Sequence, residues 1–237
     1  MNSKKVKRIG LLGGMSWEST LHYYRIINET VKARLGGHHS ADLVLRSLDF
    51  APVETMQRRG AWKEAGACLA VAAQECVAAG AEAIVLCTNT MHLVAGAITG
   101  AVKVPLIHIA EATGEAIKGS QIRRVGLLGT AFTMEQDFYR RRLEEAAGIE
   151  VVVPADRSRQ LVHRVIFEEL VHGVLRPESR RAYLEVCGEL AGAGAEGIVL
   201  GCTEIGMLIR EGDVPLPLFD TTEIHATAAV TWALAGD

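Results

Sequence analysis

The stretch Ala193–Ile205, AGAEGIVLGCTEI, repeats an earlier stretch of the same chain, Ala79–Met91, AGAEAIVLCTNTM. The two stretches align without a gap, and in this alignment Thr88 stands opposite Cys202. Each contains a glycine turn, a short apolar run and then small polar residues. A continuous apolar run of this length is typical of a strand in a parallel sheet that is buried on both faces. The repeat therefore predicts two equivalent strands, each followed by a polar turn.

A second pair of similar segments, IGLLGG at 9–14 and VGLLGT at 125–130, shows that the repeat extends over most of the chain. Helical patterns separate four predicted strands in each half. These strands are 6–12, 43–48, 83–86 and 104–107, then 124–128, 149–153, 198–200 and 216–219. Strands that alternate with helices indicate parallel sheets with right-handed crossovers. We therefore expect an α/β protein with two pseudo-symmetric lobes, each a four-stranded parallel sheet flanked by helices, derived from an internal duplication.

The restart of the pattern predicts the domain boundaries. Residues 1–112 are expected to form the first lobe and residues 113–220 the second, with the C-terminal helix, 221–237, packing back on the first lobe. Within the first lobe, Ser16 is predicted to cap a helix that ends at the glycine pair 36–37. Apolar residues recur in this helix at intervals of three and four, which predicts a buried face made of Leu21, Tyr24, Ile27 and Val31.

Composition excludes several classes of function. The chain has 237 residues, of which 49% are hydrophobic, and a formal net charge of −3, so no basic field attracts nucleic acid or an anionic membrane. No apolar segment approaches the roughly 20 residues needed to span a bilayer, and the N-terminal segment MNSKKVKRIG lacks a signal-peptide core. The five cysteines are odd in number and lack CxxC spacing, which favours reduced thiols in a cytoplasmic protein.

The histidines do not suggest a metal site. No HxxxH or HExxH spacing occurs in the chain. The simplest interpretation of His92 and His108 is that they face solvent, and the next is that they form hydrogen bonds beside a site. The segment Gln57–Arg59 also has two interpretations, an exposed helix start or an arm whose arginines bind a carboxylate.

The paired polar turns are the best candidates for chemistry. Residues 88–90 and 202–204 combine hydroxyls, an amide, a thiol and a carboxylate at the carboxyl ends of predicted strands, where open α/β sheets bind ligands. Either turn alone is explained as a helix cap, but their equivalent positions favour a shared site. We expect Cys202 to lie at a helix N-terminus, which would lower the pKa of the thiol and favour the thiolate.

Six motifs, GLLGGMSWEST, LCTNTMH, LLGTAFTMEQDFY, IFEEL, LGCTEI and PLFDTT, together resemble the cofactor-independent aspartate/glutamate racemases. The resemblance covers nearly the whole chain and is greatest to the bacterial racemases that prefer L-aspartate and L-glutamate, also described as broad-specificity amino acid racemases. It implies a small acidic amino-acid substrate, a D-amino acid product, a substrate cleft between two lobes and commonly a homodimer. It also implies that the enzyme uses neither pyridoxal phosphate nor a metal.

The resemblance assigns roles to particular residues. Most of the family has a cysteine in both polar turns, whereas this chain has Thr88 in the first, with Cys87 one residue earlier. The L-preferring branch is similar in having a threonine–cysteine pair, which implies that Cys202 is the catalytic base and Thr88 the proton donor. The implied substrate contacts are Met15, Gln57, Thr88, Asn89, Thr90, Thr203 and Glu204.

Two alternatives stay open at this point. Related enzymes that use a cysteine to isomerise or decarboxylate small dicarboxylates share the expected fold. The chain is also interpretable as a catalytically weak protein that binds an acidic amino acid. Exchange of the substrate's α-hydrogen with deuterated water separates a racemase from a binding protein.

Overall fold

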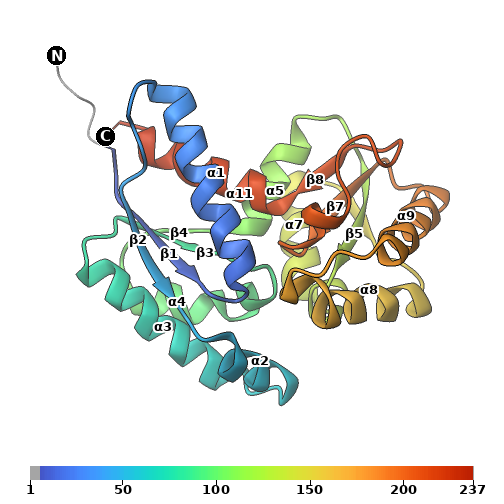
Figure 1. The fold of residues 1–237 in the computed structure, drawn as a ribbon, viewed down its shortest axis with the longest axis horizontal. Coiled ribbons are helices and arrows are strands. Elements are labelled where there is room, and N and C mark those ends of the chain that lie inside the picture. The colour runs from blue at the N-terminus through green and yellow to red at the C-terminus, as the bar shows by residue number, and fades with distance from the viewer. Residues whose placement is uncertain (1–5, 237) are drawn as a thin grey trace. The chain divides into compact units, whose positions relative to one another are not determined.

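The computed structural model describes residues 6–236, so the first five residues of the N-terminal segment discussed above lie outside the described residues. The chain divides into two compact units. The first unit runs to His108 and resumes at His225, and the second is Ile109–Ile224. Each unit contains a four-stranded parallel sheet flanked by helices, which confirms the expected α/β class (Figure 1).

The first unit has the strand order β2-β1-β3-β4, and all three strand pairs are parallel. Its elements in chain order are β1 (Ile9–Gly13), α1 (Trp17–Leu35), β2 (Leu43–Ser47), α2 (Phe50–Arg58), α3 (Trp62–Ala78), β3 (Ala83–Leu86), the 3₁₀ helix η1 (Thr90–Val94), α4 (Ala95–Ala101) and β4 (Leu106–Ile107). The last helix of the chain, α11 (Thr221–Leu234), contributes most of its buried residues to this unit.

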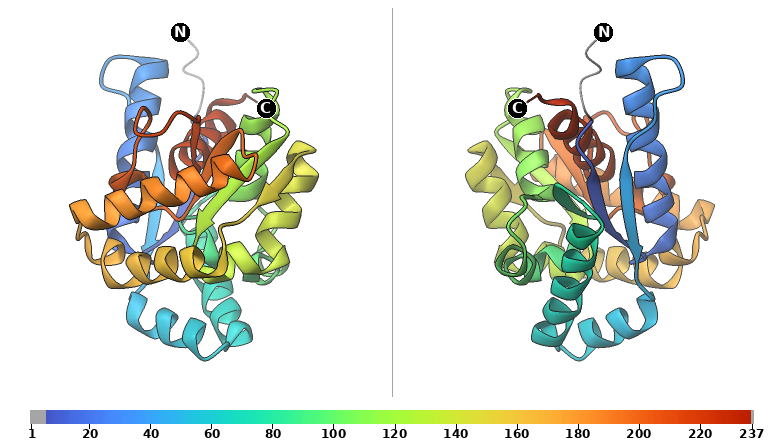
Figure 2. Two further views of the ribbon diagram at one scale, coloured as in Figure 1. Left: turned by 90° about the vertical axis from the view of Figure 1, so that its right-hand side faces the viewer. Right: turned by 90° about the vertical axis from the view of Figure 1, so that its left-hand side faces the viewer.

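Helices cover both faces of the first sheet, as expected for strands that are apolar on both sides. On one face, Ile9 and Leu11 of β1 share a core with buried side chains of α1 and α11. On the other face, Leu12 shares a core with α3 and α4. In Figure 2, right, helix α1 (blue) and helix α3 (teal) lie on opposite sides of the first strands.

The buried face of α1 differs from the predicted one. Ile27 and Val31 are buried as expected, together with Tyr23, but Leu21 is 59% exposed and Tyr24 is 51% exposed. Leu21 and Tyr24 instead continue a second stripe that begins at Trp17, with the i, i+4, i+7 spacing of one helix face. Both stripes have helical spacing, so periodicity alone cannot decide which one packs against the sheet.

The second unit has the strand order β6-β5-β7-β8, again all parallel. Its elements are α5 (Ile109–Lys118), β5 (Arg124–Gly129), α6 (Ala131–Glu135), α7 (Asp137–Ala147), β6 (Glu150–Val152), α8 (Asp156–Glu168), the 3₁₀ helix η2 (Leu170–His172), α9 (Pro177–Gly192), β7 (Gly197–Gly201), α10 (Ile205–Leu208) and β8 (Leu218–Asp220). One continuous hydrophobic core fills this unit.

The two sheets repeat one another in register as well as in strand order. Gly10 of β1 pairs with Ile84 of β3, and the matching Gly126 of β5 pairs with Ile198 of β7. A Cβ on Gly10 would lie 2.9 Å from the Cys76 Cβ of α3, and a Cβ on Gly126 would lie 2.7 Å from the Leu190 Cδ1 of α9. The glycine therefore lets the equivalent helix of each unit approach the central strand closely.

No helix within residues 6–236 is long and apolar enough to cross a membrane.

Candidate active site

The polar turns predicted from the repeat follow the carboxyl ends of β3 and β7, which are inner strands of the two sheets. Thr88, Asn89 and Thr90 are buried in the first unit. Cys202, Thr203 and Glu204 are buried in the second. Side chains this polar are rarely buried without partners, so the bonds that each turn makes within its own unit define what it can do.

The first turn is held by its backbone. The Thr88 N–H donates to the Leu86 carbonyl at 2.8 Å, and the Thr88 carbonyl oxygen lies 2.7 Å from the His92 Nδ1. Because a carbonyl can only accept, the His92 Nδ1 carries the proton. His92 therefore fixes the main chain that presents the Thr88 hydroxyl.

His92 belongs to a buried histidine cluster, which we define as His92, His108 and His225. The His92 ring centroid lies 4.4 Å from that of His108 and 5.8 Å from that of His225. All three side chains are buried, so the interpretation of His92 and His108 as solvent-facing is wrong. Within residues 6–236 no group of three or more His, Cys, Asp or Glu side chains is arranged to hold a metal ion, this cluster included.

His225 is fixed in one neutral form. Its Nε2 lies 2.7 Å from the Ile107 carbonyl oxygen and must donate, so its Nδ1 accepts the proton of the Tyr23 hydroxyl at 2.8 Å. Burial lowers the pKa of His225 to about 4, because a charged imidazolium cannot be hydrated in the core.

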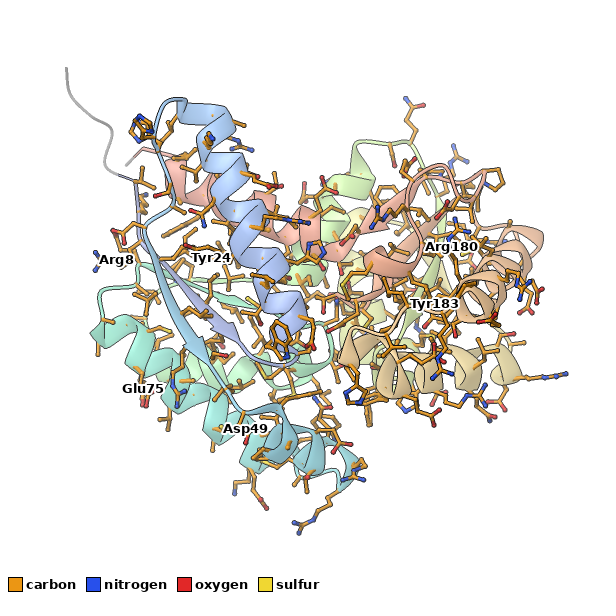
Figure 3. The ribbon with its side chains drawn as sticks, in the orientation of Figure 1. Arg8, Tyr24, Asp49, Glu75, Arg180 and Tyr183 are labelled. Atoms are coloured by element: carbon orange, nitrogen blue, oxygen red, sulfur yellow. The ribbon has the colours of Figure 1, made fainter. Side chains whose placement is uncertain are left out.

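Gln57 is joined to the first turn through Met91. The Gln57 Nε2 donates to the Met91 Sδ at 3.1 Å, and the Gln57 side chain is only 4% exposed. The expectation that Gln57–Arg59 begins a helix is wrong, because α2 begins after its N-cap Asp49 (labelled in Figure 3) and ends at Arg58. Arg58 is mostly exposed and pairs with Glu54 on the same helix.

The glycine turn after β1 presents Met15, the other contact implied in the first unit. The Gly14 N–H donates to the Thr20 Oγ1 at 2.8 Å. Gly14 has a φ of +89°, and a Cβ on it would overlap the backbone of Leu48. Only glycine fits here, and the turn places Met15 in the same hydrophobic core as Met91.

The second turn contains a thiol–carboxylate pair. The Cys202 Sγ donates to the Glu204 Oε2 at 2.9 Å, and the Thr203 Oγ1 donates to the same oxygen at 2.8 Å. The turn is tied to the start of α11, where the Thr222 Oγ1 donates to the Thr203 carbonyl at 3.4 Å. A Cβ on Gly206 would overlap the Asp220 carboxylate, so a larger residue at this position would displace that side chain.

The pKa of Cys202 is shifted in the direction opposite to the sequence expectation. Burial raises it well above the ordinary value, and the charge and hydrogen bond of Glu204 raise it further. Helix α10 has only four residues and begins at Ile205, so its N-terminus does not overcome these effects. The resting state of the pair is therefore a thiol that donates to a carboxylate.

Cys87 is not a second candidate base. Its side chain is fully buried in the first core, where the Sγ contacts the Val85 carbonyl at 3.9 Å. Burial raises the pKa of the Cys87 thiol far above its ordinary value. Cys76 and Cys187 are buried as well, and Cys68 is half-buried.

The bond of His92 to the Thr88 carbonyl agrees with the second interpretation of this histidine, a hydrogen bond beside a site, and the spacing of four residues, one helical turn, is its sequence signal. One feature of the site was not predicted. The carboxylate of Glu204 follows the thiol of Cys202 by two residues, but the sequence does not show that the two side chains turn toward each other.

The family model for Asp/Glu/Hydantoin racemases matches residues 12–229. The crystal structure of a candidate Asp/Glu racemase from Yersinia pestis is 52% identical, with a TM-score of 0.89 over 97% of this chain and 100% of that chain. An aspartate racemase homologue from Pyrococcus horikoshii OT3 is 37% identical, with a TM-score of 0.82 over 96% of this chain and 99% of that chain.

A more distant structure, the aspartate racemase of Picrophilus torridus, shares the fold, with 20% identity and a TM-score of 0.77 over 96% of this chain and 94% of that chain. The resemblance inferred from the six motifs is confirmed by the family match, which spans nearly the whole chain. The chain belongs to the Asp/Glu/Hydantoin racemase family and is an isomerase of the racemase type.

Proposed function

We propose that this enzyme is a cofactor-independent amino-acid racemase that interconverts L-aspartate or L-glutamate with the D-isomer. The observation that carries the proposal is the duplicated polar turn, which holds a hydroxyl, Thr88, in one unit and a thiol bonded to a carboxylate, Cys202 with Glu204, in the other. The names of the relatives from Pyrococcus and Picrophilus, both of which refer to aspartate racemase, support an acidic substrate.

Racemisation requires one proton to leave the α-carbon and another to arrive on the opposite face. A single base would have to move around the substrate, whereas two fixed groups need only lie about 3–3.5 Å from the carbon. Two equivalent turns from a duplication provide such a pair. We propose that Cys202 and Thr88 act on opposite faces of the substrate's α-carbon.

The two groups have unequal abilities. A thiol has an unperturbed pKa of about 8.5 and readily acts as a base once it loses its proton. An alcohol such as Thr88 is a far weaker acid, so it is almost never present as an alkoxide. We therefore propose that Cys202 removes the α-proton of the L-isomer and that Thr88 protonates the opposite face.

The remaining residues are proposed to bind the substrate. Met15, Gln57, Asn89, Thr90 and Thr203 are buried in or beside the two turns. Backbone N–H groups of these turns would stabilise the charge that develops on the α-carboxylate as the proton leaves. Glu204 is proposed to contact the substrate as well, as the family resemblance implies.

We also propose that the enzyme is a cytoplasmic homodimer. The exposed stripe of α1, made of Trp17, Leu21 and Tyr24, is an apolar surface of the kind that subunit contacts bury (Figure 3 labels Tyr24). All five cysteines are free thiols, which suits a reducing compartment. Gel filtration with light scattering, comparing wild type with Leu21→Glu, tests the dimer, and an unchanged mass would argue against this surface.

The test of the activity is α-hydrogen exchange. L-glutamate and L-aspartate are incubated in deuterated water with wild type and with Cys202→Ala, and both loss of the α-proton signal and appearance of the D-isomer are followed. Wild type should exchange and invert, and Cys202→Ala should do neither while keeping its circular dichroism spectrum. A wild type that binds the amino acid without exchange would identify a binding protein instead.

A further inference from the structure

We propose that the second unit binds a small organic phosphate in a pocket beside α9, apart from the polar turn that contains Cys202. The pocket has a volume of about 420 Å³, within the range of about 300–1,000 Å³ that is usual for ligand sites. Among residues 6–236, its lining contains three arginines, Arg176, Arg180 and Arg210, one acid, Asp213, and otherwise apolar side chains. All of these residues belong to the second unit.

Three segments form the walls of this pocket: residues 175–180 at the start of α9, residues 207–208 of α10 and residues 210–213 of the loop before β8. The Ser179 Oγ donates to the Glu169 Oε2 at 2.6 Å, which ties the start of α9 to the residue that follows α8. Arg180 of α9 (labelled in Figure 3) forms an ion pair with Asp213 of the loop. Side-chain bonds therefore hold two of the three walls in place, so the pocket is formed in the absence of a ligand.

Asp213 balances the charge of one arginine and leaves the other two unbalanced. Its Oδ1 accepts from the Arg180 Nη2, and its Oδ2 accepts the backbone N–H of Arg210 at 2.8 Å. In the part of the chain that the structure describes, the guanidinium groups of Arg176 and Arg210 have no ion-pair or hydrogen-bond partner. The pocket therefore presents two positive charges that are available to an anion.

The apolar part of the lining indicates that the anion has an organic substituent. Leu175 is 48% exposed, and Pro177 beside it is also exposed. Met207 is partly buried and Leu208 is buried, so the apolar lining continues from the surface into the unit. An organic group that covers Leu175 and Pro177 would remove apolar surface from water, which favours binding.

A phosphate monoester matches both parts of the lining. It carries a charge of about −1.5 to −2 at pH 7, which balances the unpaired guanidinium groups of Arg176 and Arg210. Its oxygens accept the forked N–H groups that arginine provides, while its organic substituent contacts the apolar side chains. A phosphate ester should therefore bind more tightly than inorganic phosphate, which has no such substituent.

The substrate proposed above does not fit this pocket as well. An acidic amino acid carries an ammonium group besides its carboxylates, and that group needs a hydrogen-bond acceptor. Both carboxylate oxygens of Asp213 already accept hydrogen bonds from residues of the pocket. The pocket is therefore assigned to a second ligand, and the assignment does not depend on the racemase reaction.

Isothermal titration calorimetry with phenyl phosphate tests the site. The titration is repeated with inorganic phosphate, which lacks the organic group, and with succinate, a dicarboxylate. Arg176→Gln and Arg210→Gln each remove one unpaired guanidinium group, from different walls, and Leu175→Ser removes apolar lining. Arg164→Gln is the matched control, because Arg164 is an exposed arginine of α8 in the same unit that does not line the pocket.

Phenyl phosphate should bind wild type at one site per chain, and more weakly as salt is raised. Arg176→Gln and Arg210→Gln should each weaken binding by about tenfold or more, because each removes charge-assisted hydrogen bonds. Leu175→Ser should weaken the binding of phenyl phosphate by about threefold or more but leave that of inorganic phosphate unchanged. Arg164→Gln should match wild type.

Four results would overturn the assignment. Wild type without saturable binding of phenyl phosphate would refute the site, and equal affinities of wild type and both arginine variants would place the ligand elsewhere. Inorganic phosphate that binds as tightly as phenyl phosphate would refute the organic subsite, and tighter binding of succinate would refute the choice of phosphate.

Circular dichroism checks that each variant folds. If Arg210→Gln does not fold, Arg176→Gln, which changes a different wall of the pocket, decides the outcome. These titrations involve no turnover, so a failure here leaves the racemase proposal intact, and a failure of α-hydrogen exchange leaves this assignment intact.

Discussion

Lowering the pH from 7.5 to 5.0 should destabilise the first unit through His225. The folded state holds this ring neutral, because Nε2 donates to Ile107 and Nδ1 accepts from Tyr23. Its pKa falls from 6.5 to about 4 on burial. Below pH 6.5 the unfolded chain therefore binds a proton that the folded chain refuses, and stability decreases until the pH reaches about 4.

The magnitude follows from the size of the shift. Each pKa unit corresponds to about 1.36 kcal/mol, so the full loss below pH 4 is about 3.4 kcal/mol. Between pH 7.5 and pH 5.0 the expected loss from this one ring is about 2 kcal/mol. His225→Gln removes the titration and keeps an N–H that can donate to the Ile107 carbonyl. It should be less stable than wild type at pH 7.5 by about 1–3 kcal/mol, because the Tyr23 hydroxyl loses its acceptor.

The assay is urea unfolding followed by tryptophan fluorescence. The three tryptophans, Trp17, Trp62 and Trp232, all belong to the first unit, so their emission reports on the unit that contains His225. Between the two pH values, wild type should lose about 2 kcal/mol more than His225→Gln. The exposed His39→Gln is the control and should follow wild type. Equal losses in wild type and His225→Gln, within about 0.5 kcal/mol, would refute the assigned ring state.

Three further predictions concern the active site. Thr88→Cys should raise kcat/KM for inversion equally from both isomers, because the equilibrium constant of racemisation is fixed at one. Initial rates measured separately from each isomer check this prediction. No gain in kcat/KM would argue against Thr88 as the second proton-transfer group. Activity should persist in protein that lacks pyridoxal absorbance and has been dialysed against a chelator, and a loss restored by either additive would contradict this. Gly14→Ala should destabilise the protein by about 3 kcal/mol or more, because Gly14 has a positive φ and the added Cβ would overlap Leu48. Gly148 also has a positive φ but open space around it, so Gly148→Ala should cost about 1 kcal/mol. Equal losses of stability in urea unfolding would contradict the overlap.

The repeat was sufficient to predict the fold class. A run such as Ile84–Leu86 can be buried on both faces only between layers of helices, and its copy at 198–200 requires a second sheet of the same kind. Gly10 and Gly126 occupy the same register in their sheets, so the duplication includes the pairing of the strands as well as their order. What periodicity could not decide was which of two helical stripes on α1 packs inward, since that depends on the shape of the sheet surface.

The positions of the two polar turns were predictable from the sequence, and their electrostatics less so. The turns containing Thr88 and Cys202 follow equivalent strand ends, as the alignment of the two copies predicts. The pKa of Cys202 was predicted in the wrong direction, because the rule for helix N-termini ignores a carboxylate that is bonded to the thiol. Glu204 lies beside Cys202 only after the turn is folded, and no sequence spacing encodes that distance.

Helix α2 shows the same limit. A helix start was one of the two interpretations of Gln57–Arg59, but the capping residue Asp49 lies eight positions before Gln57 and the helix ends at Arg58. The consequence is functional, because the end of the helix brings the Gln57 amide to Met91 and the first turn.

The most direct test of unequal two-sided proton transfer is the ratio of α-hydrogen exchange to inversion, measured in deuterated water from each isomer separately. Starting from the L-isomer, Cys202 should remove the proton and often return a deuteron to the same face, after its own proton has exchanged with solvent. Starting from the D-isomer, the slow removal on the Thr88 face should be followed almost always by delivery from Cys202. We therefore expect a ratio well above one from the L-isomer and near one from the D-isomer. Equal ratios from the two isomers would show that both faces carry equivalent bases and would contradict the assignment of Cys202 and Thr88.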